Sequence, residues 1–211
     1  MFRDRREAGT VLARDVAALP ELEGGVVLGL PRGGVPVAYE VARACGLPLD
    51  VLLVRKLGVP GQEELAMGAI ASGGIVVLNR RILHSVHISK ETLCAAVERA
   101  KQEMERQERE FRGGRAAVQI EGRTVILVDD GLATGATMRA AARAVRPLAR
   151  RVVVAVPVGA QITCRGLAGE ADQVICHEIP DPFEAVGNFY FNFEPTSDEE
   201  VKALMRAGSG E

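Results

Sequence analysis

Residues 124–141 read TVILVDDGLATGATMRAA. The four apolar residues at positions 125–128 are mostly β-branched and do not alternate with polar residues, so they predict a buried strand. Two adjacent carboxylates, Asp129 and Asp130, follow this strand, and a loop of small residues at 131–137 leads into an alanine-rich helical pattern. This order predicts a site at the carboxyl end of a strand. The helix N-terminus there offers free N–H groups and a positive dipole end to an anion.

The composition of the 131–137 loop indicates which anion it could bind. The loop lacks the lysine of the GxxxxGK[ST] motif, and the chain has no GxGxxG motif. Gly135 and Ala136 let a phosphate approach the backbone, and the hydroxyls of Thr134 and Thr137 can donate hydrogen bonds. A single phosphate bound by neutral donors beside two carboxylates suits a sugar phosphate, because the carboxylates can accept hydrogen bonds from vicinal hydroxyls.

The alternative interpretation of this segment is an ordinary turn in which Thr134 or Thr137 caps the helix. That interpretation leaves Asp129 and Asp130 unexplained, because two unpaired carboxylates at the end of a buried strand repel each other and are poorly solvated. The functional interpretation is therefore favoured over the structural one.

The segment VILVDDGLATGATM, residues 125–138, resembles the phosphoribosyl-pyrophosphate-binding signature of type I phosphoribosyltransferases. It is most similar to the version found in adenine phosphoribosyltransferases. The resemblance implies an α/β fold with a mostly parallel central sheet, flanking helices and a bound Mg²⁺. It implies catalytic roles for Asp129 and Asp130, which would also bind the metal through water or substrate hydroxyls. It further implies a substrate-binding loop made of Ala133, Thr134, Gly135, Ala136 and Thr137.

A second glycine-rich loop follows an earlier predicted strand. Residues 26–30 are apolar and lead through Pro31-Arg32-Gly33-Gly34 into a predicted helix over residues 37–45. Arg32 can present a planar fork of donors to a diphosphate. In the resembled family the loop after the first strand of the sheet binds pyrophosphate, which implies substrate-binding roles for Arg32, Gly33 and Gly34. The alternative is an exposed arginine on a plain turn.

A third candidate region lies at residues 49–64. Residues 49–54 predict a strand that ends in Arg55 and Lys56, and the glycine and proline residues between 57 and 64 predict a mobile loop. Basic residues beside such a loop suit a lid over a polyanion. Members of the resembled family place basic residues here, which implies catalytic roles for Arg55 and Lys56. The alternative is the solvated base of a loop.

The remaining pattern alternates strands and helices, which predicts an α/β architecture. We expect one domain over residues 1–211, with a core at about 24–180 and a tail at about 181–211. The tail concentrates most of the aromatic residues, which could stack on a planar base or anchor the tail; both interpretations stay open. These residues are Phe183, Phe189, Tyr190, Phe191 and Phe193.

Composition narrows the possible partners and surroundings. The net charge of −2 gives no general attraction to nucleic acid or anionic membranes. No apolar run reaches the length of a membrane span, and residues 1–16 lack the apolar segment of a signal peptide. The four cysteines show no CxxC spacing and predict reduced thiols. We therefore expect a cytoplasmic protein without nucleic-acid or membrane partners, and a homodimer, the commonest state for such enzymes.

The function implied by the resemblance is phosphoribosyl transfer. The donor would be 5-phosphoribosyl 1-pyrophosphate with Mg²⁺, the acceptor an unidentified nitrogenous base, the other product pyrophosphate, and the role nucleotide salvage. One alternative is a regulatory protein that binds phosphoribosyl pyrophosphate or a nucleotide without catalysis. A second alternative is a phosphorolytic or hydrolytic enzyme acting on nucleotides. The residues identify the donor but leave the acceptor open.

Overall fold

The centre of the molecule is a parallel sheet whose strand order is β2-β1-β6-β7-β8. The computed structural model describes residues 1–86 and 88–208, apart from the side chains of residues 63, 64 and 80. All four neighbouring strand pairs in this sheet run parallel, as the alternation of strands and helices predicted. The strands are β1 (Val26–Gly29), β2 (Leu49–Val51), β6 (Thr124–Val128), β7 (Arg151–Val158) and β8 (Gln173–Glu178).

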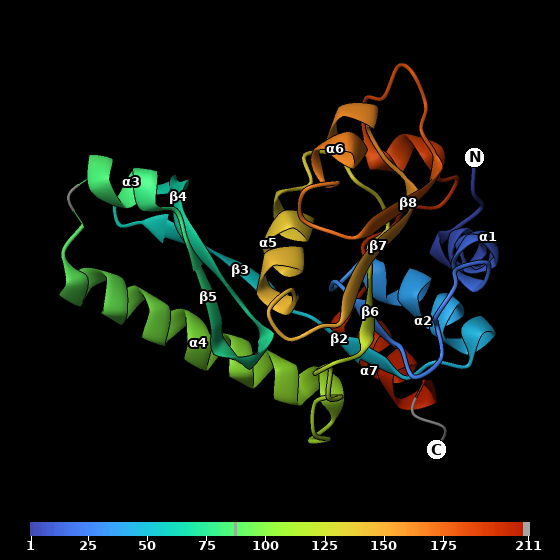
Figure 1. Cartoon of the computed structure of the whole chain (residues 1–211), viewed down its shortest axis with the longest axis horizontal. Coiled ribbons are helices and arrows are strands. Elements are labelled where there is room, and N and C mark those ends of the chain that lie inside the picture. Colours follow the sequence, from blue (N-terminus) through green and yellow to red (C-terminus); the bar gives the residue numbers. More distant parts are fainter. Residues whose placement is uncertain (87, 209–211) are drawn as a thin grey trace.

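Helices cover both faces of this sheet because its strands are apolar on both sides (Figure 1). On one face, Val27, Ile126 and Val153 share a core with α1 (Arg5–Ala17), α2 (Gly34–Cys45) and α7 (Asp198–Ala207). On the other face, the neighbouring strand residues share a core with α5 (Ala136–Val145) and α6 (Gln161–Gly166). Successive strand residues therefore point to opposite layers, as the period of two requires.

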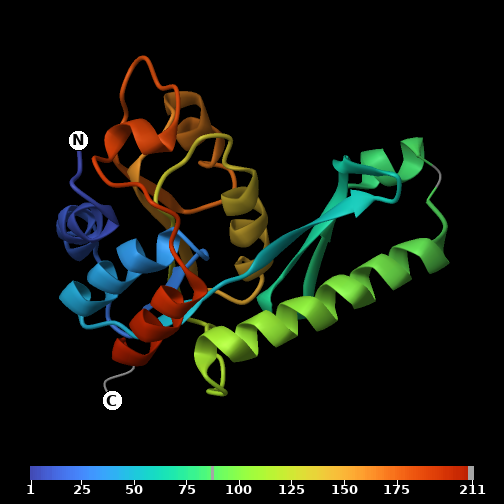
Figure 2. The ribbon, with the colours of Figure 1, turned by 180° about the vertical axis from the view of Figure 1, so that it is seen from behind.

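A projecting arm, residues 54–112, extends from this core (Figures 1 and 2). Its strands form an antiparallel sheet in the order β3-β4-β5, and the long helix α4 runs along the arm. The arm comprises β3 (Val54–Val59), β4 (Gln62–Ala71), the short turn η1 (Ser72–Gly74), β5 (Ile75–Leu78), α3 (Arg80–Ser85) and α4 (Lys90–Arg112).

The prediction of a mobile loop at residues 57–64 is wrong, because these residues belong to a β-hairpin formed by β3 and β4. Only Pro60 and Gly61 form a turn, and Val59 pairs with Gln62 across the two strands. Glycine and proline marked the hairpin turn correctly. However, the pairing of β3 with β4 shifts register between Leu57 and Gly58 and between Gly58 and Val59, which interrupts the regular alternation of side chains along β3. The predicted strand 49–54 is also divided, because β2 ends at Val51 and β3 begins the second sheet at Val54.

A buried ion network joins the arm to the core. Arg112, in the last turn of α4, donates from Nε to Asp50 Oδ1 over 2.8 Å and from Nη1 to Glu108 Oε2 over 2.9 Å. Its Nη2 donates to the carbonyl of Val51 in β2 over 3.1 Å. The second oxygen of Asp50 accepts the N–H of Val118 over 2.9 Å. The base of the arm is therefore fixed by charge-assisted hydrogen bonds in addition to apolar packing.

The aromatic tail packs against the N-terminus. The backbones of Phe2 and Phe191 are joined by a hydrogen bond of 2.8 Å, and Phe2 shares a small apolar cluster with Tyr190. The rings of Phe183 and Phe189 stack with centroids 5.7 Å apart, next to the short helix η2 (Val186–Phe189). These contacts confirm that most of the rings anchor the tail, whereas the Phe191 side chain is exposed and base stacking stays a prediction.

Candidate active site

Gly33 and Gly34 bring the loop after β1 directly against the acidic pair, Asp129 and Asp130. β1 and β6 are adjacent and parallel, so the segments that leave their carboxyl ends lie side by side. A Cβ on Gly33 would lie 2.8 Å from Asp130 Cγ, and a Cβ on Gly34 would lie 2.9 Å from Asp129 Cα. No larger residue fits at either position without displacing the acidic pair. The structure thus unites two regions that are about a hundred residues apart in the chain.

Asp130 has a partner that the sequence analysis missed. Arg5, the first residue of α1, donates from Nε to Asp130 Oδ2 over 2.8 Å, and both side chains are largely buried. Arg5 is itself oriented by the tail, since its Nη1 donates to the carbonyl of Glu194 over 2.7 Å and its guanidinium lies 4.0 Å from the centre of the Phe193 ring. No local pattern around Arg5 marks this role, because its partner lies 125 positions away.

Tyr190 adds a second contact from the tail to the acidic pair. Its hydroxyl donates to the backbone carbonyl of Asp130 over 2.7 Å. Burial raises the pKa of Tyr190, so the hydroxyl keeps its proton and remains a donor. The N-terminal helix and the aromatic tail therefore cooperate in fixing the second carboxylate of the pair.

The two carboxylates differ in their electrostatic surroundings. Burial raises the pKa of Asp129 well above its ordinary value, and repulsion from Asp130 raises it further. Burial also raises the pKa of Asp130, but the hydrogen bond and charge of Arg5 oppose that increase. Asp129 Oδ1 accepts the N–H of Asp130 over 2.9 Å, which is a weaker compensation than an ion pair. A cation or a hydroxyl donor at Asp129 would therefore relieve unfavourable burial.

The 131–137 loop presents an open helix N-terminus. Gly135 precedes α5 in the left-handed region with φ of 69°, which favours glycine, and α5 has no side-chain cap. The alternative in which Thr134 or Thr137 caps the helix is therefore wrong. Both threonines are exposed, and no side chain caps the first N–H groups of α5.

The rear of this loop is held by the segment that follows β7. Thr163 Oγ1, in α6, donates to the carbonyl of Ala133 over 2.6 Å. The N–H of Leu132 donates to the carbonyl of Val158, and the N–H of Ala160 donates to that of Leu132, each over 2.9 Å. These hydrogen bonds give the backbone of the 131–137 loop a fixed shape.

The three basic candidate residues, Arg32, Arg55 and Lys56, lie in different surroundings. Arg32 is exposed in the loop that adjoins the acidic pair, and its Nη1 lies 3.5 Å from Asp198 Oδ1 at the start of α7. Arg55 Nη1 lies 2.8 Å from Glu103 Oε2, and its Nη2 donates to Gln107 over 3.3 Å, so this side chain turns toward α4. Lys56 is exposed on the same strand. The loop that carries Arg32 therefore adjoins the acidic pair while its guanidinium pairs with Asp198, and Arg55 is engaged within the arm.

Few of the described side chains near the site could bind a metal ion. Among the described residues, no group of three or more His, Cys, Asp and Glu side chains converges as a metal site. Mg²⁺ does not require such a group, since it usually keeps several waters and uses one or two carboxylates together with substrate phosphates. Asp129 and Asp130 therefore fit a Mg²⁺ that is shared with a phosphorylated ligand.

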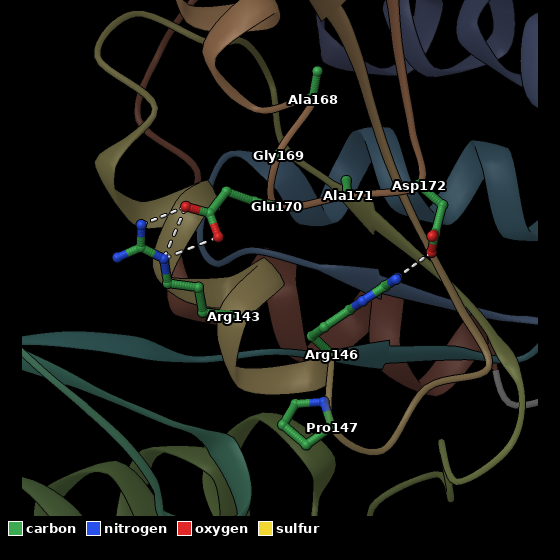
Figure 3. A pocket seen from close by; sticks show the side chains of 8 residues that line it. All are labelled: Arg143, Arg146, Pro147, Ala168, Gly169, Glu170, Ala171 and Asp172. Carbon is green, nitrogen blue, oxygen red and sulfur yellow. Dashed lines mark hydrogen bonds and ion pairs between the residues drawn. The ribbon is translucent and has the colours of Figure 1, made fainter.

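A separate hollow of about 470 Å³ lies at the other end of α5 (Figure 3). The charged side chains that line it are engaged in ion pairs, Arg143 with Glu170 and Arg146 with Asp172. These pairs fasten α5 to the segment before β8. The hollow consequently offers little free charge, and it lies away from the acidic pair.

The chain is similar to known proteins in sequence and in fold. A family described as the phosphoribosyl transferase domain matches residues 21–166. Over 206 residues, or 97% of this chain, the sequence is 47% identical to a Mycobacterium tuberculosis protein that is provisionally named a phosphoribosyl transferase. The match covers 46% of that relative, so this chain spans less than half its length. The crystal structure of TT1426 from Thermus thermophilus is 44% identical, with a TM-score of 0.85 and 97% of each chain covered.

None of the helices in the described part of the chain is both long and apolar enough to cross a membrane.

Proposed function

The chain belongs to the phosphoribosyl transferase domain family, and from this we propose that it transfers a phosphoribosyl group from 5-phosphoribosyl 1-pyrophosphate to a nitrogenous base, with Mg²⁺, in nucleotide metabolism. The observation that carries the proposal is the convergence of three elements at one sheet edge. These are the acidic pair, the Gly33–Gly34 approach and the uncapped N-terminus of α5. Each element suits a different part of the donor.

The sugar phosphate end of the donor would occupy the 131–137 loop. The N–H groups at the start of α5 and the hydroxyls of Thr134 and Thr137 would bind the 5′-phosphate, and the helix dipole favours its charge. Gly135 and Ala136 let the phosphate approach the backbone closely. Because Thr163 and the Leu132 backbone already fix the loop, little ordering entropy would be lost on binding.

The acidic pair would act on the ribose. Asp129 would accept hydrogen bonds from the vicinal hydroxyls, and both carboxylates would favour the positive charge that develops on the ribose as pyrophosphate departs. Arg5 already donates to Asp130, which makes Asp130 a poorer proton acceptor. The pair therefore serves electrostatic stabilisation better than proton abstraction from the base.

The pyrophosphate end would meet the Arg32 loop. The backbone of Gly33 and Gly34 lies against the acidic pair, so Arg32 can reach the leaving group from the adjoining position. Arg55 and Lys56 are assigned a supporting catalytic role, for which Arg55 has to exchange Glu103 for the ligand. Mg²⁺ would neutralise part of the pyrophosphate charge, while Asp129 and Asp130 would hold it through water or substrate hydroxyls.

The test is a calorimetric titration of 5-phosphoribosyl 1-pyrophosphate with and without Mg²⁺. We expect metal-dependent binding to the wild type and a loss of about a hundredfold or more in affinity in the Asp129→Asn, Asp130→Asn double variant. Glu23→Gln, a substitution at an exposed position in the turn before β1, is the matched control and should bind normally. Absence of binding to the wild type, with ribose 5-phosphate also inactive, would rule out this donor.

The ion pair between Arg5 and Asp130 keeps one alternative open, namely a regulatory protein that binds the same donor without transferring it. An acid engaged by arginine can bind a ligand yet contribute little to catalysis. Pyrophosphate release measured across a panel of nucleobases separates the two functions. Release with any base supports the transferase, whereas donor binding without release supports the regulator.

A further inference from the structure

Two cysteine side chains meet behind the 131–137 loop. Cys164 lies in α6 and is buried, while Cys176 lies in β8 and is half-buried. A Cβ on Gly159 would lie 2.9 Å from the Cys164 sulfur and 3.2 Å from the Cys176 sulfur, so both sulfurs crowd the same point beside the backbone. The two thiols are therefore neighbours that are not joined as a disulfide, and the S–H of Cys176 donates to the carbonyl of Glu178 over 3.1 Å.

This contact makes the two thiols chemically unequal. The neighbouring Cys176 thiol lowers the pKa of Cys164. The neighbouring Cys164 thiol, together with burial, raises the pKa of Cys176. Because the thiolate is the reactive form of cysteine, Cys164 is the more readily oxidised thiol and Cys176 is the partner placed to react with it next.

The cysteine pair is in direct structural contact with the 131–137 loop. Thr163, the neighbour of Cys164, donates to the carbonyl of Ala133, and its methyl carbon would lie 2.5 Å from a Cβ on Gly135. Gly159 also forms a parallel bridge with Leu132. A movement of α6 would therefore be transmitted through Thr163 to the loop at Ala133 and Gly135.

We propose that Cys164 and Cys176 form an oxidative modification site, at which a peroxide converts the two thiols to a disulfide and thereby loosens the 131–137 loop. The Cys164 thiolate attacks one oxygen of hydrogen peroxide, so an S–O bond forms, the O–O bond breaks, and the leaving hydroxide takes up a proton as water. Cys176 then attacks the resulting sulfenic acid. An S–S bond forms, the S–O bond breaks, and a second water leaves with the Cys176 proton.

The disulfide shortens the distance between the two sulfurs. A disulfide fixes its sulfur atoms about 2.05 Å apart, which is closer than two sulfur atoms that are not covalently bonded can approach. Since β8 is fixed in the parallel sheet by its pairing with β7, the short helix α6 has to move. That movement displaces Thr163 from the loop.

The first part of the test needs no substitution. Hydrogen peroxide is added to the intact protein, the disulfide is measured by intact mass and thiol titration, and amide hydrogen exchange is measured over residues 131–137. We expect loss of two hydrogen atoms, faster exchange in the loop and reversal by dithiothreitol. Retention of both thiols, oxidation to isolated sulfinic acids, or a disulfide with unchanged loop exchange would each overturn the proposal.

Matched variants assign the effect to this pair. Cys176→Ser should form no disulfide, and exchange in its loop should not respond to peroxide. Cys94→Ser, which removes an exposed thiol on α4, should behave as the wild type. A Cys94→Ser variant that no longer responds would place the disulfide elsewhere and reject the assignment.

The expected effect on the donor rests on the proposed function. We expect the oxidised protein to bind 5-phosphoribosyl 1-pyrophosphate about fivefold more weakly than the reduced protein. If the reduced protein binds no donor, the proposed function fails, but the mass and exchange measurements still decide whether the cysteine pair controls the loop.

Discussion

The core and the arm hold their charges in different ways. In the core, the side chains of Arg5 and Asp130 are only 11% and 17% exposed, and the ion pair lies at the carboxyl end of a central strand. In the arm, the side chains of Arg55 and Glu103 are 33% and 52% exposed, and their ion pair joins β3 to α4. The ion pair of the core fixes one carboxylate of the acidic pair, while the ion pair of the arm fixes a strand against a helix.

The difference shows that basic residues cannot be assigned to a site by their position after a strand alone. Arg32 and Arg55 both follow or occupy predicted strand ends, yet only Arg32 lies in the loop that adjoins the acidic pair. The arm places Arg55 beside Glu103 and Gln107 of α4, partners that the linear pattern did not indicate. Four substitutions test this contrast.

The largest effect is expected at the junction of core and arm. Arg112→Ala would leave Asp50 and Glu108 buried without their shared cation, and breaking such a buried pair costs about 3–5 kcal/mol. The measurement is the free energy of unfolding in urea. Arg106→Ala removes an exposed ion pair with Glu110 on the same helix and should cost about 0.5 kcal/mol or less. Equal losses in the two variants would show that the junction is not the stronger attachment.

The next effect concerns the ion pair of the core. Arg5→Gln removes the cation at Asp130, so the carboxylate loses its fixed orientation, and we expect about a tenfold loss in affinity for 5-phosphoribosyl 1-pyrophosphate by calorimetry. Arg5→Lys should be intermediate, because lysine keeps the charge but lacks the fork that also binds Glu194. Arg14→Gln, an exposed change on the same helix, is the control. Unchanged affinity in Arg5→Gln would mean that Asp130 needs no positioning.

A smaller effect, of opposite sign, is expected in stability at Asp129. Burial raises the pKa of this carboxyl in the folded chain, so the folded state binds its proton more tightly than the unfolded state does. Stability therefore falls as the pH rises from about 4, the pKa of an aspartate in the unfolded chain, through the higher pKa of Asp129 in the folded chain. Asp129→Asn should remove this loss and stabilise the protein at neutral pH by about 1 kcal/mol, or about 2–4 °C in Tm.

Asp129→Asn should at the same time weaken donor binding, because the amide cannot replace the carboxylate at the ribose or the metal. Thermal unfolding measured at pH 5 and pH 8 checks the sign, since the gain should be larger at pH 8. A loss of stability at both pH values would contradict the unfavourable burial of Asp129.

The smallest effect is expected in the arm. Arg55→Ala removes a partly exposed ion pair with Glu103 and should lower the free energy of unfolding by about 1 kcal/mol or less. Its effect on donor affinity should be smaller than that of Arg32→Ala, measured in the same titration. A larger effect at Arg55 would show that the arm closes over the ligand and that Arg55 leaves Glu103.

Many local features of the fold could be predicted because each depends on neighbouring residues. Ser89 and Ser197 cap α4 and α7 with hydrogen bonds to the third following N–H group, and Gly113 ends α4 with φ of 60°. The hairpin between β3 and β4 was predicted as a loop because glycine and proline signals were extended beyond the two residues that turn. The direction of Arg55 could not be predicted, since it depends on how α4 packs.

The sequence by itself determined the acidic pair after a buried strand, the small-residue loop that follows it and the glycine-rich segment after an earlier strand, because each of these features depends on residues close together in the chain. Only the tertiary structure decided that Arg5 binds Asp130, that Tyr190 and Phe193 support them, and that Cys164 meets Cys176. Those contacts join residues brought together by packing, and no local propensity or spacing encodes which distant side chain fills the space beside a buried charge.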